Sequence, residues 1–136
     1  MYPEKVAIII KDDLLSWQKL NVVSFLAGSI AIAYPETHGG EFITADNIKF
    51  LPFIKHPTLI YKAETKEKLV RVFNRARERG LAIGIYTKPL FDTRSGEENV
   101  AEIARTKTED LDLVGIIIYG ENKKVDKALD GLKFHD

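Results

Sequence analysis

The chain opens with a short apolar run followed by a longer stretch whose apolar residues recur at helical spacing. Val6 to Ile10 is continuous and mostly β-branched, as is typical of a strand covered on both faces. Leu20 to Ala33 contains no charged residue. Because a helix without charge has no face that prefers water, we expect this helix to be buried, with Asp12 or Asp13 as its cap.

Strands and helices alternate along the rest of the chain. Apolar runs predict strands at 58–63, 81–87 and 111–119, and helical periodicity predicts helices at 65–80, 95–104 and 122–131, before a small edge strand at 132–134. Residues 35–56 are irregular, with a short extended piece near 48–52. This alternation predicts an α/β fold built from packed layers, whose strand order the pattern does not give.

The composition bounds the class of protein. With 136 residues, 45% of them hydrophobic, the chain can form one compact core, so we expect a single domain spanning 1–136. Twenty basic and twenty acidic residues cancel, which disfavours non-specific binding to nucleic acid or anionic lipid. The lack of cysteine excludes thiol chemistry. Together with the lack of a signal-peptide pattern or a membrane-length apolar run, it favours a cytoplasmic protein without a membrane partner.

The few polar residues of the first helix are candidates for a binding site. Gln18, Asn21, Ser24 and Gly28 follow one line along that helix. They could line a pocket at the end of the first strand, where the two amides would fix the orientation of a ligand. The alternative is structural, because small and amide residues let a neighbouring element approach closely while their hydrogen bonds are satisfied internally.

Residues next to this line supply charge and apolar surface. Lys11 and Lys19 would attract an anion, and Trp17 would either contact a ligand or serve as a core anchor. Thr87 and Lys88 end a predicted strand, and the carboxyl ends of strands in open α/β sheets are where ligands bind. A simple strand-ending turn explains these two residues equally well.

A basic face marks the helix predicted at 65–80. Lys68, Arg71, Arg75 and Arg79 lie three or four residues apart and could follow the phosphates of RNA. We prefer the simpler interpretation of a solvated face supported by ion pairs between neighbouring turns, because no aromatic residues are interleaved for base stacking.

No familiar cofactor, metal or nucleophile motif is present. His38, His56 and His135 occur in separate segments without ligand-like spacing, and neither a Gly-rich nucleotide loop nor a nucleophile elbow occurs. Side chains of the adjacent residues Asp12 and Asp13 diverge, which favours helix capping over acid–base chemistry. We therefore expect no cofactor and no metal.

Both ends of the chain carry a family resemblance. Residues 6–28, with Lys11 and Asp13-Leu14 after the strand, resemble the type 2 peptidyl-tRNA hydrolase superfamily, as does the ending Gly120-x4-Val125-Asp126-Lys127-x3-Gly131-Leu132-Lys133-Phe134. An uncharacterised, mainly bacterial family attached to that superfamily is more similar still, in Trp17-Gln18-Lys19-Leu20-Asn21 with Phe25-Leu26 and in Lys124-Val125-Asp126-Lys127 with Gly131-Leu132 and His135. The resemblance implies a three-layer α/β/α sandwich around a mixed sheet.

The catalytic pattern of the hydrolases is largely missing. Those enzymes have a Gly-Lys leading into Ala-Ala-Gln and a histidine on the first helix, and an Asp-Ala-Gly-x-Thr turn after a later strand. Here only Lys19 matches, the first helix has no histidine, and Thr87-Lys88-Pro89 stands at the later turn. Because transition-state stabilisation depends on donors placed where charge develops, we expect the hydrolase activity to be absent.

The sequence therefore predicts a binding domain on a hydrolase-like fold, whose partner is a small anionic ligand or a protein near the start of the first helix. One alternative is an enzyme with rearranged acid–base groups, such as a hydrolase of an RNA-linked or amide substrate. Another is an RNA-binding module that uses helix 65–80, and a homodimer could form through 132–134 or 50–54. The expected ligand-binding residues are Lys11, Trp17, Gln18, Lys19, Asn21, Thr87 and, as an outlying candidate, His135.

Overall fold

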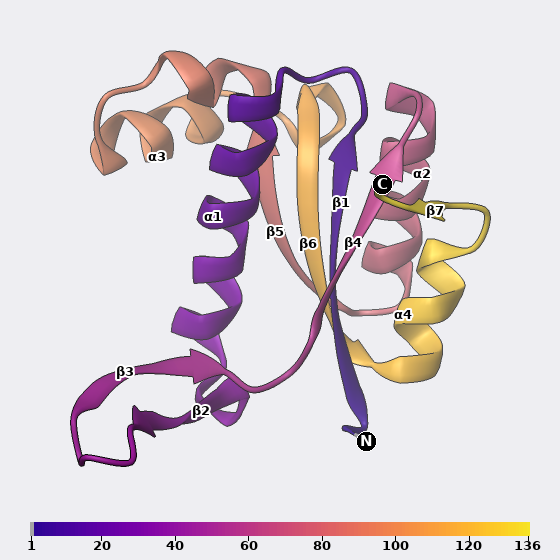
Figure 1. The fold of residues 1–136 in the computed structure, drawn as a ribbon. Coiled ribbons are helices and arrows are strands. Elements are labelled where there is room, and N and C mark those ends of the chain that lie inside the picture. Colours follow the sequence, from indigo (N-terminus) through magenta and orange to yellow (C-terminus); the bar gives the residue numbers. More distant parts are fainter. Residues whose placement is uncertain (1) are drawn as a thin grey trace.

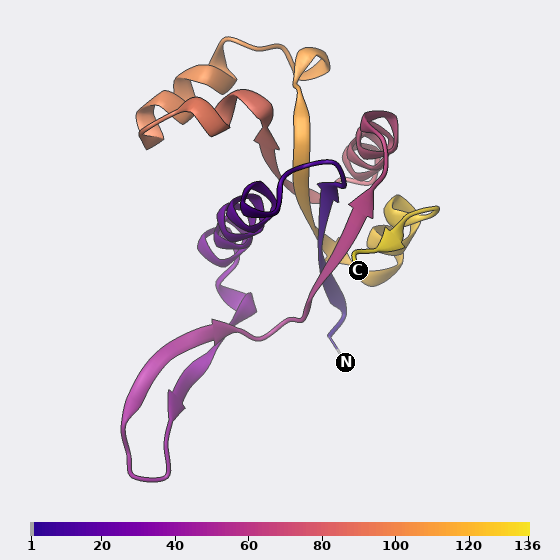
Figure 2. The ribbon, with the colours of Figure 1, turned by 45° about the horizontal axis from the view of Figure 1, so that its top comes forward.

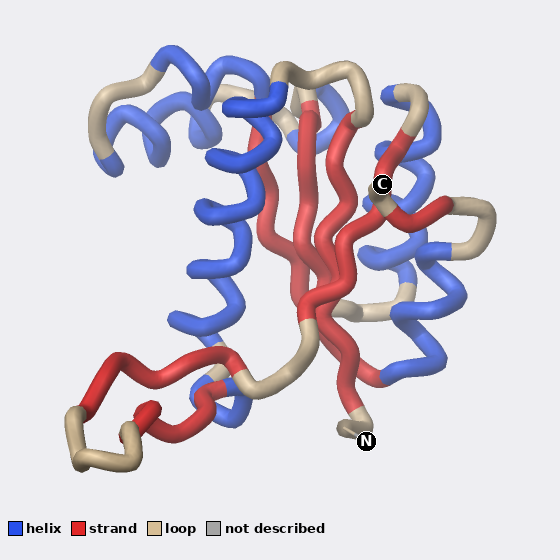
Figure 3. Tube along the Cα trace, viewed as in Figure 1, coloured by secondary structure: helices blue, strands red, loops and turns tan. Residues whose placement is uncertain are grey.

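A five-stranded mixed sheet lies at the centre of the computed structural model, which describes residues 2–136 (Figures 1 and 3). Its strands run in the order β5-β6-β1-β4-β7. Their bounds are β1 Glu4–Lys11, β4 Thr58–Ala63, β5 Ala82–Thr87, β6 Leu113–Glu121 and β7 Lys133–Phe134. Strands β1, β4 and β5 share one direction, whereas β6 is antiparallel to both its neighbours and β7 is antiparallel to β4. The α/β class and the mixed sheet predicted above are confirmed.

Helices cover both faces of this sheet (Figure 2). The α-helices are α1 Ser16–Ala33, α2 Lys66–Glu78, α3 Gly96–Ala104 and α4 Asn122–Leu129, and the 3-10 helices are η1 Pro35–Thr37, η2 Lys88–Asp92 and η3 Thr108–Asp110. Helix α1 packs on one face, and α2 and α4 pack on the other. No helix within residues 2–136 combines the length and apolar character needed to cross a bilayer.

The central strand β1 contributes to two separate hydrophobic clusters. Val6, Ile8 and Ile10 point toward α1, while Ala7 and Ile9 point toward α2 and α4. All five side chains are at most 1% exposed. The continuous apolar run is therefore a strand covered on both faces, as its sequence predicts.

The expectation that α1 is buried is wrong for its outer face. Val22, Leu26 and Ile30 are buried against the sheet, but Leu20 is 70% exposed and Ile32 is 85% exposed. The sequence pattern misleads here because apolar residues cover all faces of the helix, whereas the sheet contacts only one.

The cap of α1 also differs from the prediction. Leu15 occupies the cap position, and its backbone N–H donates to the Gln18 side-chain oxygen at 3.0 Å, whereas neither Asp12 nor Asp13 caps the helix. Helix α2 follows its prediction more closely, because Thr65 accepts the Lys68 N–H at its start.

The irregular segment 35–56 forms η1 and a separate β-hairpin. The hairpin consists of β2 His38–Ile43 and β3 Lys49–Ile54, and it projects away from the main sheet (Figures 1 and 2). Asn47, with a φ of 67°, lies in its connecting turn. Its exposed large apolar side chains are Phe42, Ile43, Ile48, Phe50, Leu51 and Phe53. The sequence predicts only a short extended piece near 48–52, so most of this hairpin is an addition to the expected fold.

Candidate functional site

The carboxyl ends of β1, β4 and β5 meet at one edge of the sheet, at the top of Figure 1. The chain leaves β1 toward α1 on one face and leaves β4 toward α2 on the other. Strands whose connections depart to opposite faces leave a crevice between them, and ligands of open α/β sheets bind in such crevices. This edge is therefore where a ligand site is expected.

A hollow of about 360 Å³, here called the β1-end hollow, opens at this edge beside β6 and η2, and not in the crevice between β1 and β4. Two residues expected from the sequence, Lys11 and Gln18, line it. Lys88, the first residue of η2, joins them, and an apolar wall is formed by Leu14, Phe91 and Val114. Six of its nine lining residues are charged or polar, so the hollow joins a mainly polar lining to one apolar wall. Its volume falls within the range of small-molecule sites.

Three aspartates also line the β1-end hollow, and two of them are paired. Asp13 lies 3.5 Å from the Lys11 ammonium, and Asp112 lies 3.0 Å from Lys66. For Lys88 and Asp92, no ion pair is found within residues 2–136. One positive and one negative side chain are thus left to interact with a ligand.

Trp17 and Gln18 take specific positions beside this hollow. The Trp17 ring is 54% exposed and meets the Phe91 ring edge-on, with centroids 6.0 Å apart. Trp17 therefore contacts the apolar wall through Phe91 but does not itself line the hollow. The Gln18 oxygen accepts the Leu15 N–H, so its amide NH₂ is the part that remains to donate to a ligand.

Lys19 points to a second group of side chains at the same edge. Its Nζ lies 3.1 Å from Asp12 Oδ1 and 3.0 Å from His135 Nε2. Since an ammonium only donates, His135 accepts at Nε2, and Nδ1 then carries the proton toward the Asp136 carbonyl oxygen at 3.2 Å. The Lys19 hydrogen bond, together with the charges of Lys19 and Lys62, holds the pKa of Asp12 below its usual value. The structure thus joins His135 to Lys19, which sequence spacing could not reveal.

Asn21 and Thr87 do not line the β1-end hollow. Asn21 is exposed on the outer face of α1. Thr87 is 2% exposed, and its hydroxyl has no hydrogen-bond partner within the described chain. The ligand-binding roles expected for these two residues remain predictions.

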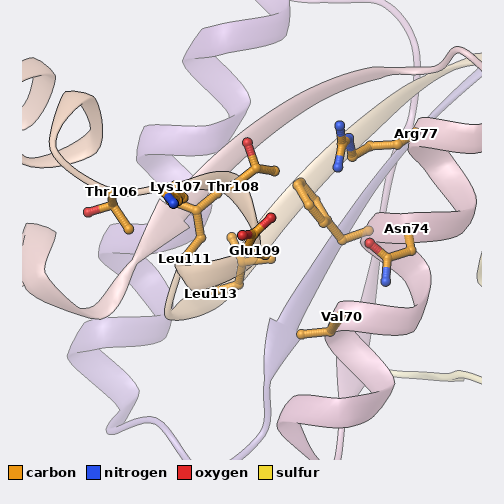
Figure 4. Close-up of a pocket in the computed structure, with 10 residues that line it drawn as sticks. Val70, Asn74, Arg77, Thr106, Lys107, Thr108, Glu109, Leu111 and Leu113 are labelled. Carbon is orange, nitrogen blue, oxygen red and sulfur yellow. The ribbon is translucent and has the colours of Figure 1, made fainter.

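A larger hollow of about 630 Å³ lies on the other side of β6 (Figure 4). Asn74 and Arg77 face it from α2, and Lys107 and Glu109 face it from the segment before β6. The apolar part of its lining consists of Val70, Phe73, Leu111 and Leu113. No local sequence pattern indicates this hollow, because only the fold brings α2 beside a loop about 30 residues further along the chain.

An aromatic cluster occupies the opposite end of the sheet. The buried His56 ring contacts Tyr2, with centroids 4.3 Å apart, and Tyr119, at 5.9 Å. Burial, reinforced by the negative charges of Glu4 and Glu36, raises the pKa of Tyr119 to about 12. In the part of the chain that the structure describes, no three His, Asp or Glu side chains gather as a metal site would require.

Comparisons with known proteins give the family but no activity. No protein with a curated description matches the chain. A solved structure, the protein of unknown function Atu0240 from Agrobacterium tumefaciens strain C58, superimposes with a TM-score of 0.94 at 28% identity, and the match covers 100% of both chains. The pattern of the DUF2000 family, described as proteins of unknown function, matches residues 4–136. The chain is a member of the DUF2000 family.

Proposed function

We propose that this protein binds a small molecule that carries an anionic group and a short apolar body in the β1-end hollow. The observation that carries the proposal is the convergence of Lys11, Gln18 and Lys88 on an apolar wall at the edge of the sheet where β1 and β5 end. Polar groups that converge on an apolar surface provide orientation and affinity together.

The charges of the hollow select the ligand. Lys88 has no carboxylate partner of its own within residues 2–136, so its ammonium is available to an anion. Lys11 is held by Asp13 at 3.5 Å, a distance that leaves its other donors available. Asp92 lines the same hollow, so a ligand that also carries an ammonium group fits as well. A purely cationic ligand could pair with Asp92 but would leave the Lys88 ammonium without a counter-charge, so we expect it to bind less tightly than an anion or a zwitterion.

Three molecules with the same phenylethyl body test this selection. They are 3-phenylpropionate, which is anionic, L-phenylalanine, which is zwitterionic, and 2-phenylethylamine, which is cationic. In a thermal-shift titration, we expect the first two to raise the melting temperature, because a ligand that binds only the folded state stabilises it. Stabilisation by the amine alone would contradict the proposal.

Two matched lysine variants show which of the two hollows binds 3-phenylpropionate. Lys88→Met removes the charge but retains the length, and it should weaken binding of 3-phenylpropionate about 10- to 100-fold, as expected for a charge-assisted hydrogen bond. Lys107→Met alters a lysine of the larger hollow instead and should leave binding unchanged. The opposite outcome, with loss only in Lys107→Met, would move the site to the larger hollow.

A second candidate function is supported by the contact of Lys19 with Asp12 and His135. A carboxylate, an ammonium and an imidazole in contact could serve general acid–base catalysis on an RNA-linked or amide substrate. The test is the release of N-acetylphenylalanine from N-acetylphenylalanyl-tRNA. This candidate requires hydrolysis above the uncatalysed rate that His135→Ala abolishes, and a rate equal to the blank eliminates it.

The relation to the hydrolase superfamily and the binding of RNA by α2 also remain proposals. The end segments of the chain support a relation between this family and the type 2 peptidyl-tRNA hydrolase superfamily. RNA binding by α2 is less favoured, because Lys68 pairs with Glu64 and Arg75 donates to the Asp130 carbonyl oxygen. A filter-binding titration at low salt without RNA retention would remove it.

A further inference from the structure

The outer face of α1 has the composition of an interface. Trp17, Leu20, Phe25 and Ile32 are between 45% and 85% exposed on this face. No charged residue occurs from Leu20 to the end of the helix. Helix faces that contact water normally carry charged side chains, whereas this one carries large apolar side chains around the uncharged Asn21 and Ser24. Exposed apolar surface of this kind marks an interaction site.

The β2–β3 hairpin extends this apolar surface. Its root is tied to α1, because His38 Nε2 lies 2.5 Å from the Ala31 carbonyl oxygen. Six large apolar side chains of the hairpin are between 42% and 84% exposed, and the Phe42 and Phe53 rings stack 4.5 Å apart. An isolated two-stranded hairpin is marginally stable in water, so this one requires a cover to hold its conformation.

Both ribbon views show α1 between two projecting arms. The hairpin leaves the C-terminal end of α1, and the α3 segment projects on the same side beyond its N-terminal end (Figures 1 and 2). Val100 on α3 is 71% exposed. The exposed face of α1 and the two arms are together called the α1 cradle here.

We propose that the α1 cradle is the interface of a symmetric dimer of this chain. The ten exposed apolar side chains of α1 and the hairpin leave roughly 1,000 Å² of apolar surface, taking about 200 Å² for a whole aromatic side chain and about 150 Å² for an aliphatic one. Because neighbouring hairpin residues such as Phe50 and Leu51 point to opposite sides, the second copy covers part of this surface and polar groups supply the rest of the interface. A stable interface needs about 800 Å² from each partner, and interfaces between identical chains are the more apolar ones.

A twofold axis near Ser24 would bring both the hairpin and the α3 segment into contact with the second copy. Ser24 lies about midway between Trp17 and Ile32, so the axis sets two α1 helices antiparallel across it. The hairpin of each copy then reaches the N-terminal end of α1 and the α3 segment of the other copy. Apolar side chains of the hairpin would cover Leu20 and Val100, which are exposed in the single chain.

Light scattering of the purified chain tests the dimer directly. At micromolar concentration, the expected mass is twice the 15.4 kDa of one chain. Leu20→Glu brings a charge into the interface and should raise the dimer dissociation constant at least about 100-fold. Asn74→Glu, an exposed position of α2 on the other face of the sheet, should leave that constant unchanged. A monomeric native chain would overturn the proposal, and so would a dimer that Leu20→Glu does not weaken.

A cross-linking experiment decides the geometry without disturbing the apolar surface. The chain has no cysteine, so Ser24→Cys introduces a single thiol near the proposed axis. A short bis-maleimide should join two Ser24→Cys chains, whereas Asn74→Cys chains should stay single. Equal cross-linking of both variants, or none at Ser24→Cys, would overturn the arrangement. A monomer that instead sediments with phosphatidylcholine vesicles would identify a lipid surface as the cover and would equally overturn the dimer.

Discussion

Lys19 Nζ lies 3.0 Å from His135 Nε2, although the two residues are 116 positions apart in the sequence. The contact forms because β7 returns along β4, where the His135 N–H donates to the Ile60 carbonyl oxygen. Asp12 completes the group at 3.1 Å from the same ammonium. The end of the first strand, the start of the first helix and the last strand are thereby joined at one edge of the sheet.

The ammonium of Lys19 should control the titration of Asp12. Its hydrogen bond is the largest cause of the lowered pKa of that carboxyl, so Lys19→Met should raise the pKa toward the ordinary value. Carbon-detected NMR of the carboxyl group measures the change. Lys11→Met is the control, because Lys11 pairs with Asp13 instead.

The same change has a defined effect on acid stability. Because the pKa of Asp12 is lower in the folded state, the stabilisation is present above the unfolded pKa and is lost as pH falls through the folded value. Native protein and Lys19→Met should therefore differ in stability at neutral pH and converge in acid. A constant difference across this range would show that the carboxyl is not responsible.

Removing the Thr87 hydroxyl should stabilise the protein. This oxygen is buried without a hydrogen-bond partner within residues 2–136, and a buried unpaired polar group costs about 1–3 kcal/mol. Thr87→Val retains the shape of the side chain and should raise the free energy of unfolding by about 1 kcal/mol in urea titrations. A loss of stability would indicate that the hydroxyl has a partner, such as a ligand or a water molecule.

Gly115 allows α1 to approach the sheet closely. A Cβ at this position would lie 2.6 Å from a Val22 methyl group and 3.5 Å from the Ile9 carbonyl oxygen. Gly115→Ala should therefore destabilise the fold by about 1–3 kcal/mol. Gly96→Ala is the matched control, because nothing lies within 4 Å of its Cβ, and its urea midpoint should stay close to that of the native chain.

Tyr119 should make the protein sensitive to alkali. Its folded pKa of about 12 exceeds the ordinary value of 10.0, so the unfolded chain loses this proton first and stability falls between pH 10 and 12. Tyr119→Phe should flatten that fall in urea titrations and remove the latest phenolate absorption step. An unchanged alkaline profile would mean that Tyr119 titrates as a normal tyrosine.

Local patterns in the sequence predicted most of the elements. The β-branched run in β1, the Thr65 cap of α2 and the capping serine Ser95 of α3 are local signals, and each occurs close to its predicted position. Burial on both faces of β1 also follows from its uninterrupted apolar run.

Long-range features could not be predicted in the same way. Strand order depends on pairing between distant segments, as when β6 inserts between β1 and β5. The uncharged stretch of α1 indicates burial but does not say whether the sheet or another chain supplies the cover. Lys11 and Gln18 line one hollow because both belong to the same β1–α1 connection, whereas Lys88 reaches that hollow only through the fold.

An NMR titration with 3-phenylpropionate tests the central claim, that the β1-end hollow is a binding site, most directly. We expect saturable shifts of the backbone amides of Lys11, Gln18 and Lys88, and Lys88→Met should raise the dissociation constant about 10- to 100-fold. Shifts confined to the larger hollow around Arg77 and Lys107, or no saturable shift in any amide, would contradict it.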